Sequence, residues 1–370
     1  MTRRKKQWAT PLERGYQSQP IEWHNASLTD SFLRKGKMRA IQFTQHGDYQ
    51  QLHLVNIPRP EPAQGEVLLK MQASAVNPID DAVRLGQVPG AKEPPHIPGV
   101  EGVGTIVASN NPDFPAGKRF IVRVGIMGSR GFGVWDNGVW QEYVTAPTQE
   151  FSLFPAPDTI SDAEAAGIAS GYLVALYSLM ITGEFQAGQT VLAPAVGGTV
   201  GNAVVQAAQA LGASLVITTD GSTAKVEQAK AAGYTNVIDL SQEALDKAVM
   251  RLTDGKGVNL VIDSVGGRIT GQALKALAQG GKIVIPGYAG GTEANIGITD
   301  VVFKEAQILG LNLLTRPPEL IVKARDMMLR LANEGKIKPL VNKTFPLEEA
   351  ASAQQYLMES RPFGRVILTL

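Results

Sequence analysis

The chain has 370 residues, of which 44% are hydrophobic and 19% are charged, and it carries a formal net charge of +1. It contains no cysteine, which excludes disulfides, thiol nucleophiles and thiolate metal ligands. No apolar run reaches the roughly 18 residues that a membrane-spanning helix needs, so we expect no membrane insertion.

The charge is unevenly distributed. Residues 1–37 hold eight Lys or Arg against three Asp or Glu, whereas the rest of the chain holds 27 against 31. The mildly acidic body argues against nucleic acid as the main ligand. The N-terminus lacks the apolar core of a secretory signal, and its composition is typical of a disordered basic leader, with a transit peptide as the alternative. We therefore expect a cytoplasmic protein whose first domain begins at Met38.

Short strands are predicted through the first part of the chain. The strand candidates, which alternate or are rich in β-branched and aromatic residues, are residues 38–43, 66–76, 118–126 and 138–146. Proline and glycine interrupt residues 77–104 repeatedly, which is typical of turns. An Ala-rich helix is then predicted over residues 161–180, with Ser161 and Glu164 spaced as a capping box at its start.

Apolar strands and helices alternate through the second part. The predicted strands are residues 190–195, 214–219, 235–240, 258–265, 281–288 and 306–314, and the predicted helices are residues 200–212, 222–233, 269–280 and 317–335. Near-continuous apolar strands at this spacing predict a parallel sheet covered by helices on both faces. The last strand, 364–370, has no evident partner in this part and is expected to return to the β-rich part.

A glycine-rich turn follows one of these strands and opens a helix. On the G-x-G-x-x-G template of dinucleotide-binding turns, Gly198 and Gly201 match the second and third glycines, and Val196 replaces the first. Gly198 would let backbone amides approach a pyrophosphate, and Gly201 would let the helix pack closely on its strand. Asp220 ends the next strand, where an acidic residue would bind the adenosine ribose hydroxyls. The pattern predicts a nicotinamide dinucleotide site.

Several motifs within residues 38–370 resemble the medium-chain dehydrogenase/reductase superfamily, and most of all its zinc-less quinone oxidoreductase branch. They are NPID (77–80), IPGVEGVG (97–104), NGVWQEYV (137–144), SGYLVALYSL (170–179), AVGGTVGNAVVQAA (195–208), DSVGG (263–267), GGKIVIPGYAGG (280–291), LEEAASAQQYL and GRVILTL. The resemblance implies an α/β protein with a GroES-like β-rich catalytic domain and a Rossmann-type doubly wound parallel sheet. The expected parts are the leader (1–37), the β-rich domain (38–160, completed by 318–370) and the cofactor-binding domain (161–317).

The resemblance also bears on metal binding. Zinc-dependent members of the superfamily hold a catalytic zinc with Cys, His and Cys, and the matching positions here are Asn77, Val100 and Ala166. None of these side chains is a zinc ligand, so we expect no zinc and no Lewis-acid polarisation of a substrate oxygen.

Three residues are expected to be catalytic by resemblance. Asn77 and Asp80 match a pair that lines the cleft, where Asn77 would orient a substrate carbonyl or the nicotinamide amide, although Asn-Pro is also a routine start of a turn. Ser170 matches a hydroxyl-bearing position near the nicotinamide, and the alternative is a helix-interior serine that bonds to its own backbone. His96 is expected to fill space rather than to act as an acid.

The cofactor is expected to contact ten residues. They are Gly197, Gly198, Thr199, Val200, Gly201, Asp220, Ser222, Lys225, Gly287 and Arg365. Arg365 matches a basic position that reaches the cofactor pyrophosphate in relatives, and a guanidinium suits a bidentate phosphate contact. The choice between NADP(H) and NAD(H) stays open, because Asp220 would repel a 2′-phosphate whereas Ser222 and Lys225 lie where relatives hold that phosphate. Trp140, Tyr143 and Phe132 are candidates for the pocket wall or, alternatively, the core.

These assignments predict an enzyme that transfers a hydride from NAD(P)H to a small electrophilic acceptor, either a quinone or a conjugated enone or enal. One alternative is an enoyl-thioester reductase, although Val88 stands where those relatives carry a tyrosine. Another alternative is a non-catalytic NAD(P)H-binding or RNA-binding protein, which only the basic leader supports. The resemblance further implies a homodimer.

Overall fold

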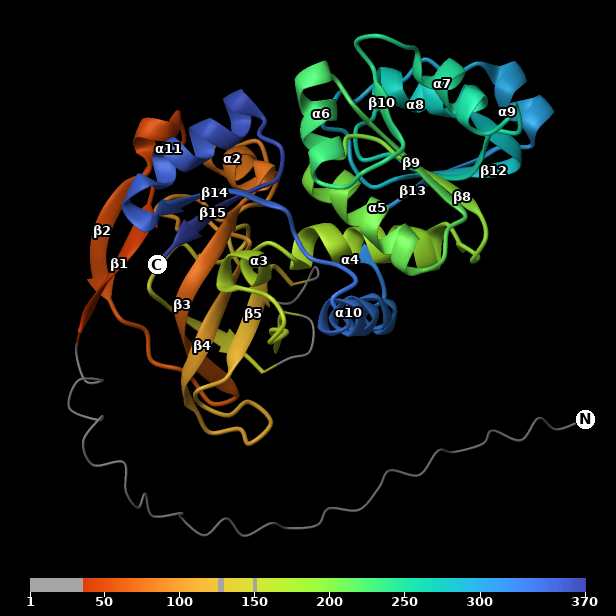
Figure 1. Ribbon diagram of the computed structural model, residues 1–370. Coiled ribbons are helices and arrows are strands. Elements are labelled where there is room, and N and C mark those ends of the chain that lie inside the picture. Colours follow the sequence, from red (N-terminus) through yellow and green to blue (C-terminus); the bar gives the residue numbers. More distant parts are fainter. Residues whose placement is uncertain (1–35, 126–129, 149–151) are drawn as a thin grey trace, which may run out of the picture. The chain divides into compact units, whose positions relative to one another are not determined.

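Two large β-sheets organise the part of the chain that this computed structural model describes, residues 36–125, 130–148 and 152–370 (Figure 1). Almost all of the predicted leader lies outside these residues. Residues Lys37–Leu370 belong to one compact unit. Among the described helices, none is long and apolar enough to cross a membrane.

The first sheet has seven strands, most of them antiparallel. They are β3 (Glu66–Val76), β4 (Glu101–Ser109), β5 (Arg119–Arg123), β6 (Tyr143–Pro147), β7 (Leu153–Pro155), β14 (Val341–Pro346) and β15 (Arg365–Thr369), in the order β14-β15-β3-β4-β5-β7, with β6 also paired to β3. The closing strand β15 runs antiparallel to β3, with Ile367 opposite Ala75. The C-terminus therefore contributes to the β-rich part. A separate antiparallel ribbon joins β1 (Lys37–Gln42) to β2 (His53–Pro58).

The second sheet has six strands, and every pair in it is parallel. They are β8 (Thr190–Ala193), β9 (Leu215–Asp220), β10 (Val237–Asp239), β11 (Val258–Ile262), β12 (Leu277–Ile285) and β13 (Gln307–Gly310). Their order is β10-β9-β8-β11-β12-β13, so the chain winds outward from β8 and then resumes on its other side at β11. This is the Rossmann strand order, and its switch point lies between β8 and β11. The predicted fold class, α/β with a doubly wound parallel sheet, is confirmed.

Helices link these strands and join the two sheets. Those of the parallel sheet are α5 (Thr199–Ala210), α6 (Thr223–Ala231), α7 (Leu245–Leu252), α8 (Arg268–Lys275) and α9 (Ile298–Lys304), and the others are α2 (Pro78–Arg84), α3 (Asp162–Ala166), α4 (Ala169–Tyr177), α10 (Pro318–Asn333) and α11 (Ala350–Gln355). Short 3₁₀-helices cover Tyr49–Gln51, Leu313–Thr315 and Leu347–Glu349, and short π-helical turns cover Ser178–Thr182 and Tyr356–Ser360.

The single helix that the sequence predicts over residues 161–180 is divided into α3 and α4. The capping box at its start is confirmed, because Ser161 Oγ accepts from the Glu164 amide at 3.3 Å and Glu164 Oε2 accepts from the Ser161 amide at 2.8 Å. Gly167 ends α3, and a Cβ at Gly167 would lie 2.9 Å from Nε of Arg365. The break therefore brings the backbone close to the closing strand.

The largest apolar core surrounds α4. This helix packs against α5 on one side and α10 on another, and Figure 1 shows α10 beside it. Leu173 of α4, Val204 of α5 and Met328 of α10 are fully or almost fully buried in this core. The same core includes Ala75 of β3, so apolar packing runs without interruption from the first sheet to the second. This shared core holds β3, α4, α5 and β15, the elements on or next to which several predicted site residues lie, in fixed positions.

Candidate functional site

The corner between β8 and α5 is built on one indispensable glycine. A Cβ at Gly201 would lie 2.2 Å from the carbonyl oxygen of Ala195 and 2.4 Å from that of Pro194, closer than any side chain tolerates. At Gly198, the N-cap of α5, an added Cβ would meet only the Ala195 oxygen, at 3.3 Å. Helix α5 can therefore begin directly beside its strand, with the backbone of Gly198, Thr199 and Val200 forming its N-terminus.

Asp220 lies at the end of β9 and faces this corner. Its Oδ1 accepts from the Gly221 amide at 2.7 Å, and its Oδ2 lies 3.1 Å from where a Cβ of Gly197 would stand. Ser222 is the N-cap of α6, and Lys225 lies in the first turn of that helix, both half-buried. The structure thus places Asp220 directly against the glycine turn and the other two residues on the adjoining helix.

Gly287 follows β12 at the carboxyl edge of the parallel sheet. An added Cβ there would lie 2.9 Å from the carbonyl oxygen of Ser264, which follows β11. The adjacent turn is fixed by Asp263, which is fully buried and accepts from the amides of Val265 and Gly266 and from the Thr270 hydroxyl. Gly287 therefore packs tightly on the loop after β11, on the same edge of the sheet as the glycine turn after β8.

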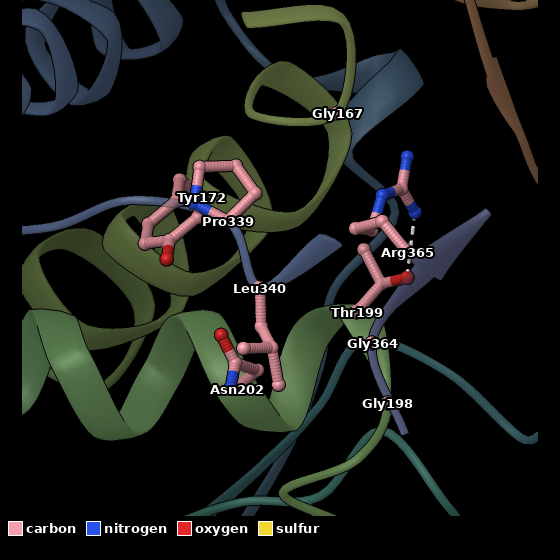
Figure 2. Close-up of a pocket in the computed structure, with 9 residues that line it drawn as sticks. All are labelled: Gly167, Tyr172, Gly198, Thr199, Asn202, Pro339, Leu340, Gly364 and Arg365. Carbon is pink, nitrogen blue, oxygen red and sulfur yellow. Dashed lines mark hydrogen bonds between the residues drawn. The ribbon is translucent and has the colours of Figure 1, made fainter. Parts of the chain in front are cut away.

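Arg365 connects the closing strand to the start of α5. Its side chain is 5% exposed, and Nη1 donates to Oγ1 of Thr199 at 2.6 Å (Figure 2). The same nitrogen donates to Oδ1 of Asn77 at 3.1 Å, and Nη2 forms an ion pair with the fully buried Glu101. Glu101 Oε2 also accepts from the backbone amide of Ser170 at 2.7 Å, near the start of α4. Sequence reasoning did not single out Glu101.

A small cavity of about 10 Å³ adjoins this cluster, about the size of one water molecule (Figure 2). Tyr172, Thr199, Asn202, Leu340 and Arg365 are among the residues that line it. Within the described residues, Nε of Arg365 is buried and has no hydrogen-bond partner. The Nε donor of the guanidinium, which lies beside Gly167, is therefore left without a partner among these residues, whereas Nη1 contacts the start of α5.

Asp80 is fully buried and caps α2. Its Oδ2 accepts from the Asn77 amide at 2.8 Å and its Oδ1 from the Gly99 amide at 3.2 Å. Burial raises the pKa of Asp80 to about 7, and the charge of Glu101 adds to this effect. The carboxylate thus joins the start of α2 to the segment around Gly99. Asn77 itself is 5% exposed and joins Arg365 through its side chain.

The remaining candidates lie mostly in the core. His96 is fully buried, its Nε2 lies 3.1 Å from the Gly133 carbonyl oxygen, and burial lowers the pKa of this imidazole to about 4. Phe132 and Trp140 are also fully buried, whereas the ring of Tyr143 lies under the guanidinium of Arg59. His96, Phe132 and Trp140 therefore contribute to packing.

Of the three positions that the sequence resemblance set against zinc ligands, Asn77, Val100 and Ala166, the last two are buried apolar residues. Across residues 36–125, 130–148 and 152–370, no cluster of three or more His, Asp or Glu side chains could hold a metal ion.

Comparison with known proteins agrees with this architecture. Residues 63–158 match the alcohol dehydrogenase GroES-like domain, and residues 199–329 match the zinc-binding dehydrogenase family. The chain is 31% identical over 317 residues to quinone oxidoreductase-like protein 2 of Bos taurus, covering 84% of this chain and 87% of the relative.

Solved structures show the same fold over most of the chain. The crystal structure of AibC superposes with a TM-score of 0.82 at 28% identity, covering 94% of this chain and 99% of that one. An NAD-dependent alcohol dehydrogenase superposes with a TM-score of 0.80 at 32% identity, covering 90% and 100%. The strand order, the glycine turn and these similarities together show that the chain belongs to the medium-chain dehydrogenase/reductase superfamily, in its quinone oxidoreductase-like branch.

Proposed function

We propose that this oxidoreductase transfers a hydride from a reduced nicotinamide dinucleotide to a quinone or a conjugated carbonyl compound. The observation that carries the proposal is the corner at Gly198 and Gly201, with the guanidinium of Arg365 at the N-terminus of α5. Helix N-termini and guanidinium groups both favour phosphate oxygens. This corner therefore offers a pyrophosphate two kinds of hydrogen-bond donor, the backbone amides at the start of α5 and the guanidinium of Arg365.

The residues present fit such a cofactor. The amides of Thr199 and Val200 and the guanidinium of Arg365 would hold the pyrophosphate, and Gly287, in the loop after β12, would line the same edge of the sheet. The bound cofactor would supply the hydride, which is chemistry that protein side chains cannot provide. The chain would contribute binding, orientation and exclusion of water.

Asp220 supports NAD(H) as the preferred cofactor. Its carboxylate lies against Gly197, where it would accept hydrogen bonds from the ribose hydroxyls and repel a 2′-phosphate. Ser222 and Lys225 lie at the start of the next helix, α6, and are the residues through which NADP(H) would bind instead. A lower Kd for NADPH than for NADH would contradict this preference.

Few side chains of this site could take part in the reaction itself. Asp80 is a poor candidate for a general acid, because both of its oxygens accept backbone amides and its side chain is fully buried. We propose that Asn77 contacts the acceptor, that Ser170 lies beside the nicotinamide, and that the proton comes from solvent. Val88, which is half-buried on the apolar core beside α2, stands where enoyl-thioester reductases of the superfamily carry a tyrosine, so we propose a quinone or enone rather than an enoyl thioester.

An apolar surface of the parallel sheet supports a homodimer. The outermost strand β13 pairs only with β12 among the described strands, and Ile308 on it is 39% exposed. Helix α9 packs against β12, the neighbour of β13, and its side chains Ile298, Val302 and Phe303 are 61–76% exposed. A second copy of the chain could pair with this edge by two-fold symmetry and cover these side chains.

The deciding experiment is a titration of the purified protein with NADH and NADPH, followed by nicotinamide absorbance against 1,4-naphthoquinone, trans-2-hexenal and 3-penten-2-one. We expect NADH to bind and at least one acceptor to be reduced. Binding of a cofactor without oxidation by any quinone, enal or enone would favour the non-catalytic alternative.

A further inference from the structure

Three buried side chains connect the interior of the first sheet to the proposed reaction cleft. Glu101 on β4 is fully buried and pairs with Nη2 of Arg365 on β15. Arg365 Nη1 donates to Oδ1 of Asn77, the residue that precedes α2, at 3.1 Å. The three residues come from distant parts of the sequence, with Asn77 and Arg365 separated by 288 positions.

This arrangement determines which end of the Asn77 amide faces Arg365. A guanidinium has only N–H donors and no acceptor, so the atom of Asn77 that faces it must be the carbonyl oxygen. The amide group is planar, and its two N–H groups then point away from Arg365. Among the described residues, the only hydrogen bond of this NH2 group is a long one, 3.5 Å, to the Ala75 carbonyl oxygen. Asn77 is therefore presented as a hydrogen-bond donor.

Glu101 holds the guanidinium in the orientation that this requires. Its two oxygens have separate partners, Nη2 of Arg365 and the backbone amide of Ser170. The second contact anchors the carboxylate to the start of α4, where no side chain of α4 itself caps the helix. A carboxylate that is fixed at one oxygen and paired at the other restricts Arg365 to one position.

We propose that Glu101 is a positioning residue, which acts through Arg365 to aim the Asn77 amide N–H at the carbonyl oxygen of the acceptor. The inference rests on the proposed function. When hydride from the reduced nicotinamide adds to the conjugated carbon, the electron pair of the double bond moves to the carbonyl oxygen. The Asn77 N–H stabilises the negative charge there, and a proton from solvent completes the reduced product while the nicotinamide leaves oxidised.

The test is a double-mutant cycle with Glu101→Gln and Asn77→Ala. Asn77→Ala should lower kcat for 1,4-naphthoquinone or 3-penten-2-one by about 100-fold, the lower end of the range for a lost oxyanion donor, with little change in the Kd for NADH. Glu101→Gln should lower kcat by about 10-fold or more, and it should also raise the Kd for NADH, because Arg365 would be held less firmly at the start of α5. The double variant should be no slower than Asn77→Ala alone, because Glu101 acts only through Asn77. Losses that multiply in the double variant, or a Glu101→Gln enzyme with unchanged kcat, would overturn the inference.

Asp81→Asn is the matched control. It removes the carboxylate from another buried ion pair, between Asp81 and Arg84 on α2, whose side chains form no hydrogen bond with those of Asn77 or Arg365 among the described residues. Its urea midpoint should fall as that of Glu101→Gln does, while its kcat stays near that of the wild type. An equal loss of kcat in the control would mean that Glu101→Gln acts through general destabilisation, and would overturn the inference.

One further variant, Asn77→Asp, applies if Glu101→Gln does not fold. Asn77→Asp keeps an oxygen toward Arg365 but replaces the N–H donor by an acceptor, so we expect normal folding, retained NADH binding and a kcat lowered by about 100-fold. Full activity of Asn77→Asp would overturn the inference while leaving the proposed function intact. A wild-type protein that reduces none of the acceptors would instead overturn the proposed function together with this inference.

Discussion

Two glycines of the same turn have different physical tasks, and their substitution separates folding from binding. Gly201→Ala would place a Cβ 2.2 Å from a backbone oxygen, so we expect a clear fall in the urea midpoint. Gly198→Ala meets its nearest atom at 3.3 Å, so the fold should survive, but the methyl group would project toward the pyrophosphate and raise the Kd for NADH about tenfold. Urea unfolding and fluorescence titration measure the two effects.

Gly221→Ala is the control for both substitutions, because nothing lies within 4 Å of a Cβ there. It should change neither the midpoint nor the Kd. If Gly198→Ala bound NADH as tightly as the wild type did, the backbone of this turn would not be the pyrophosphate site.

His96 makes the stability of the protein depend on pH. Burial lowers the pKa of His96 from an ordinary value of 6.5 to about 4, so between these values the unfolded chain binds a proton that the folded protein does not. Its contribution to stability is therefore present above pH 6.5 and is lost as the pH falls toward 4, by about 3 kcal/mol at most. Urea unfolding from pH 4 to 7 should show this slope, and His96→Asn should flatten it.

The half-exposed His46 offers the comparison for that measurement. His46→Gln should leave the slope between pH 4 and 7 as it is in the wild type. A wild-type slope that persisted in His96→Asn would assign the pH dependence to other groups.

Glu101 shows why the sequence alone did not identify every residue of the site. Its partners Ser170 and Arg365 lie 69 and 264 positions away, and no local spacing relates them. A buried acid is rare unless it is paired, but burial is visible only once the sheets are assembled. Arg365, by contrast, could be singled out because it stands in a recognisable closing motif.

At the scale of elements, strand and helix patterns predicted most of the parallel sheet. Strand β9 occupies Leu215–Asp220 against the predicted 214–219, and α5 begins within one residue of its predicted start. Apolar runs flanked by glycine turns are strong local signals, which is why these elements could be predicted. The short helices α7 and α9 were not predicted, because each has eight residues or fewer and tertiary packing rather than local periodicity decides such segments.

The division of the 161–180 helix has a measurable consequence for the site. Gly167→Ala would place a Cβ 2.9 Å from Nε of Arg365 and push the guanidinium away from Thr199. We expect weaker NADH binding, about tenfold, since Arg365 would no longer be held at the start of α5. Fluorescence titration of the variant with NADH checks this.

Ser161→Ala provides the matched control at the other end of α3. It removes the capping hydroxyl and should cost about 1 kcal/mol of stability, but it does not touch Arg365. Its Kd for NADH should equal that of the wild type. If both variants weakened NADH binding equally, destabilisation of α3 rather than displacement of Arg365 would be responsible.

At the scale of the whole molecule, strand order explains where the site residues gather. Strands β9 and β12 end at the same edge of the sheet as β8, which brings Asp220 and Gly287 to the side where α5 begins. The return of β15 to the first sheet then adds Arg365 from the far end of the chain. Composition and motif order indicated the two sheets, whereas the meeting of Arg365 with Thr199 required the three-dimensional path of the chain.

The exposed edge of the parallel sheet leads to a prediction about assembly. Strand β13 leaves one edge without a partner among the described strands, and Phe303 on α9 is 76% exposed. An unpaired edge flanked by apolar side chains favours association, and two copies related by a two-fold axis would pair their β13 strands and bury α9. Light scattering should then give twice the chain mass of 39.5 kDa for the wild type and a single chain mass for the double substitution Phe303→Glu and Ile308→Lys.

Leu54→Glu changes an exposed leucine on the separate β1–β2 ribbon and should leave the dimer intact, because that surface would not take part in the pairing. A wild-type mass of one chain, or a dimer that survives the double substitution, would contradict pairing through β13.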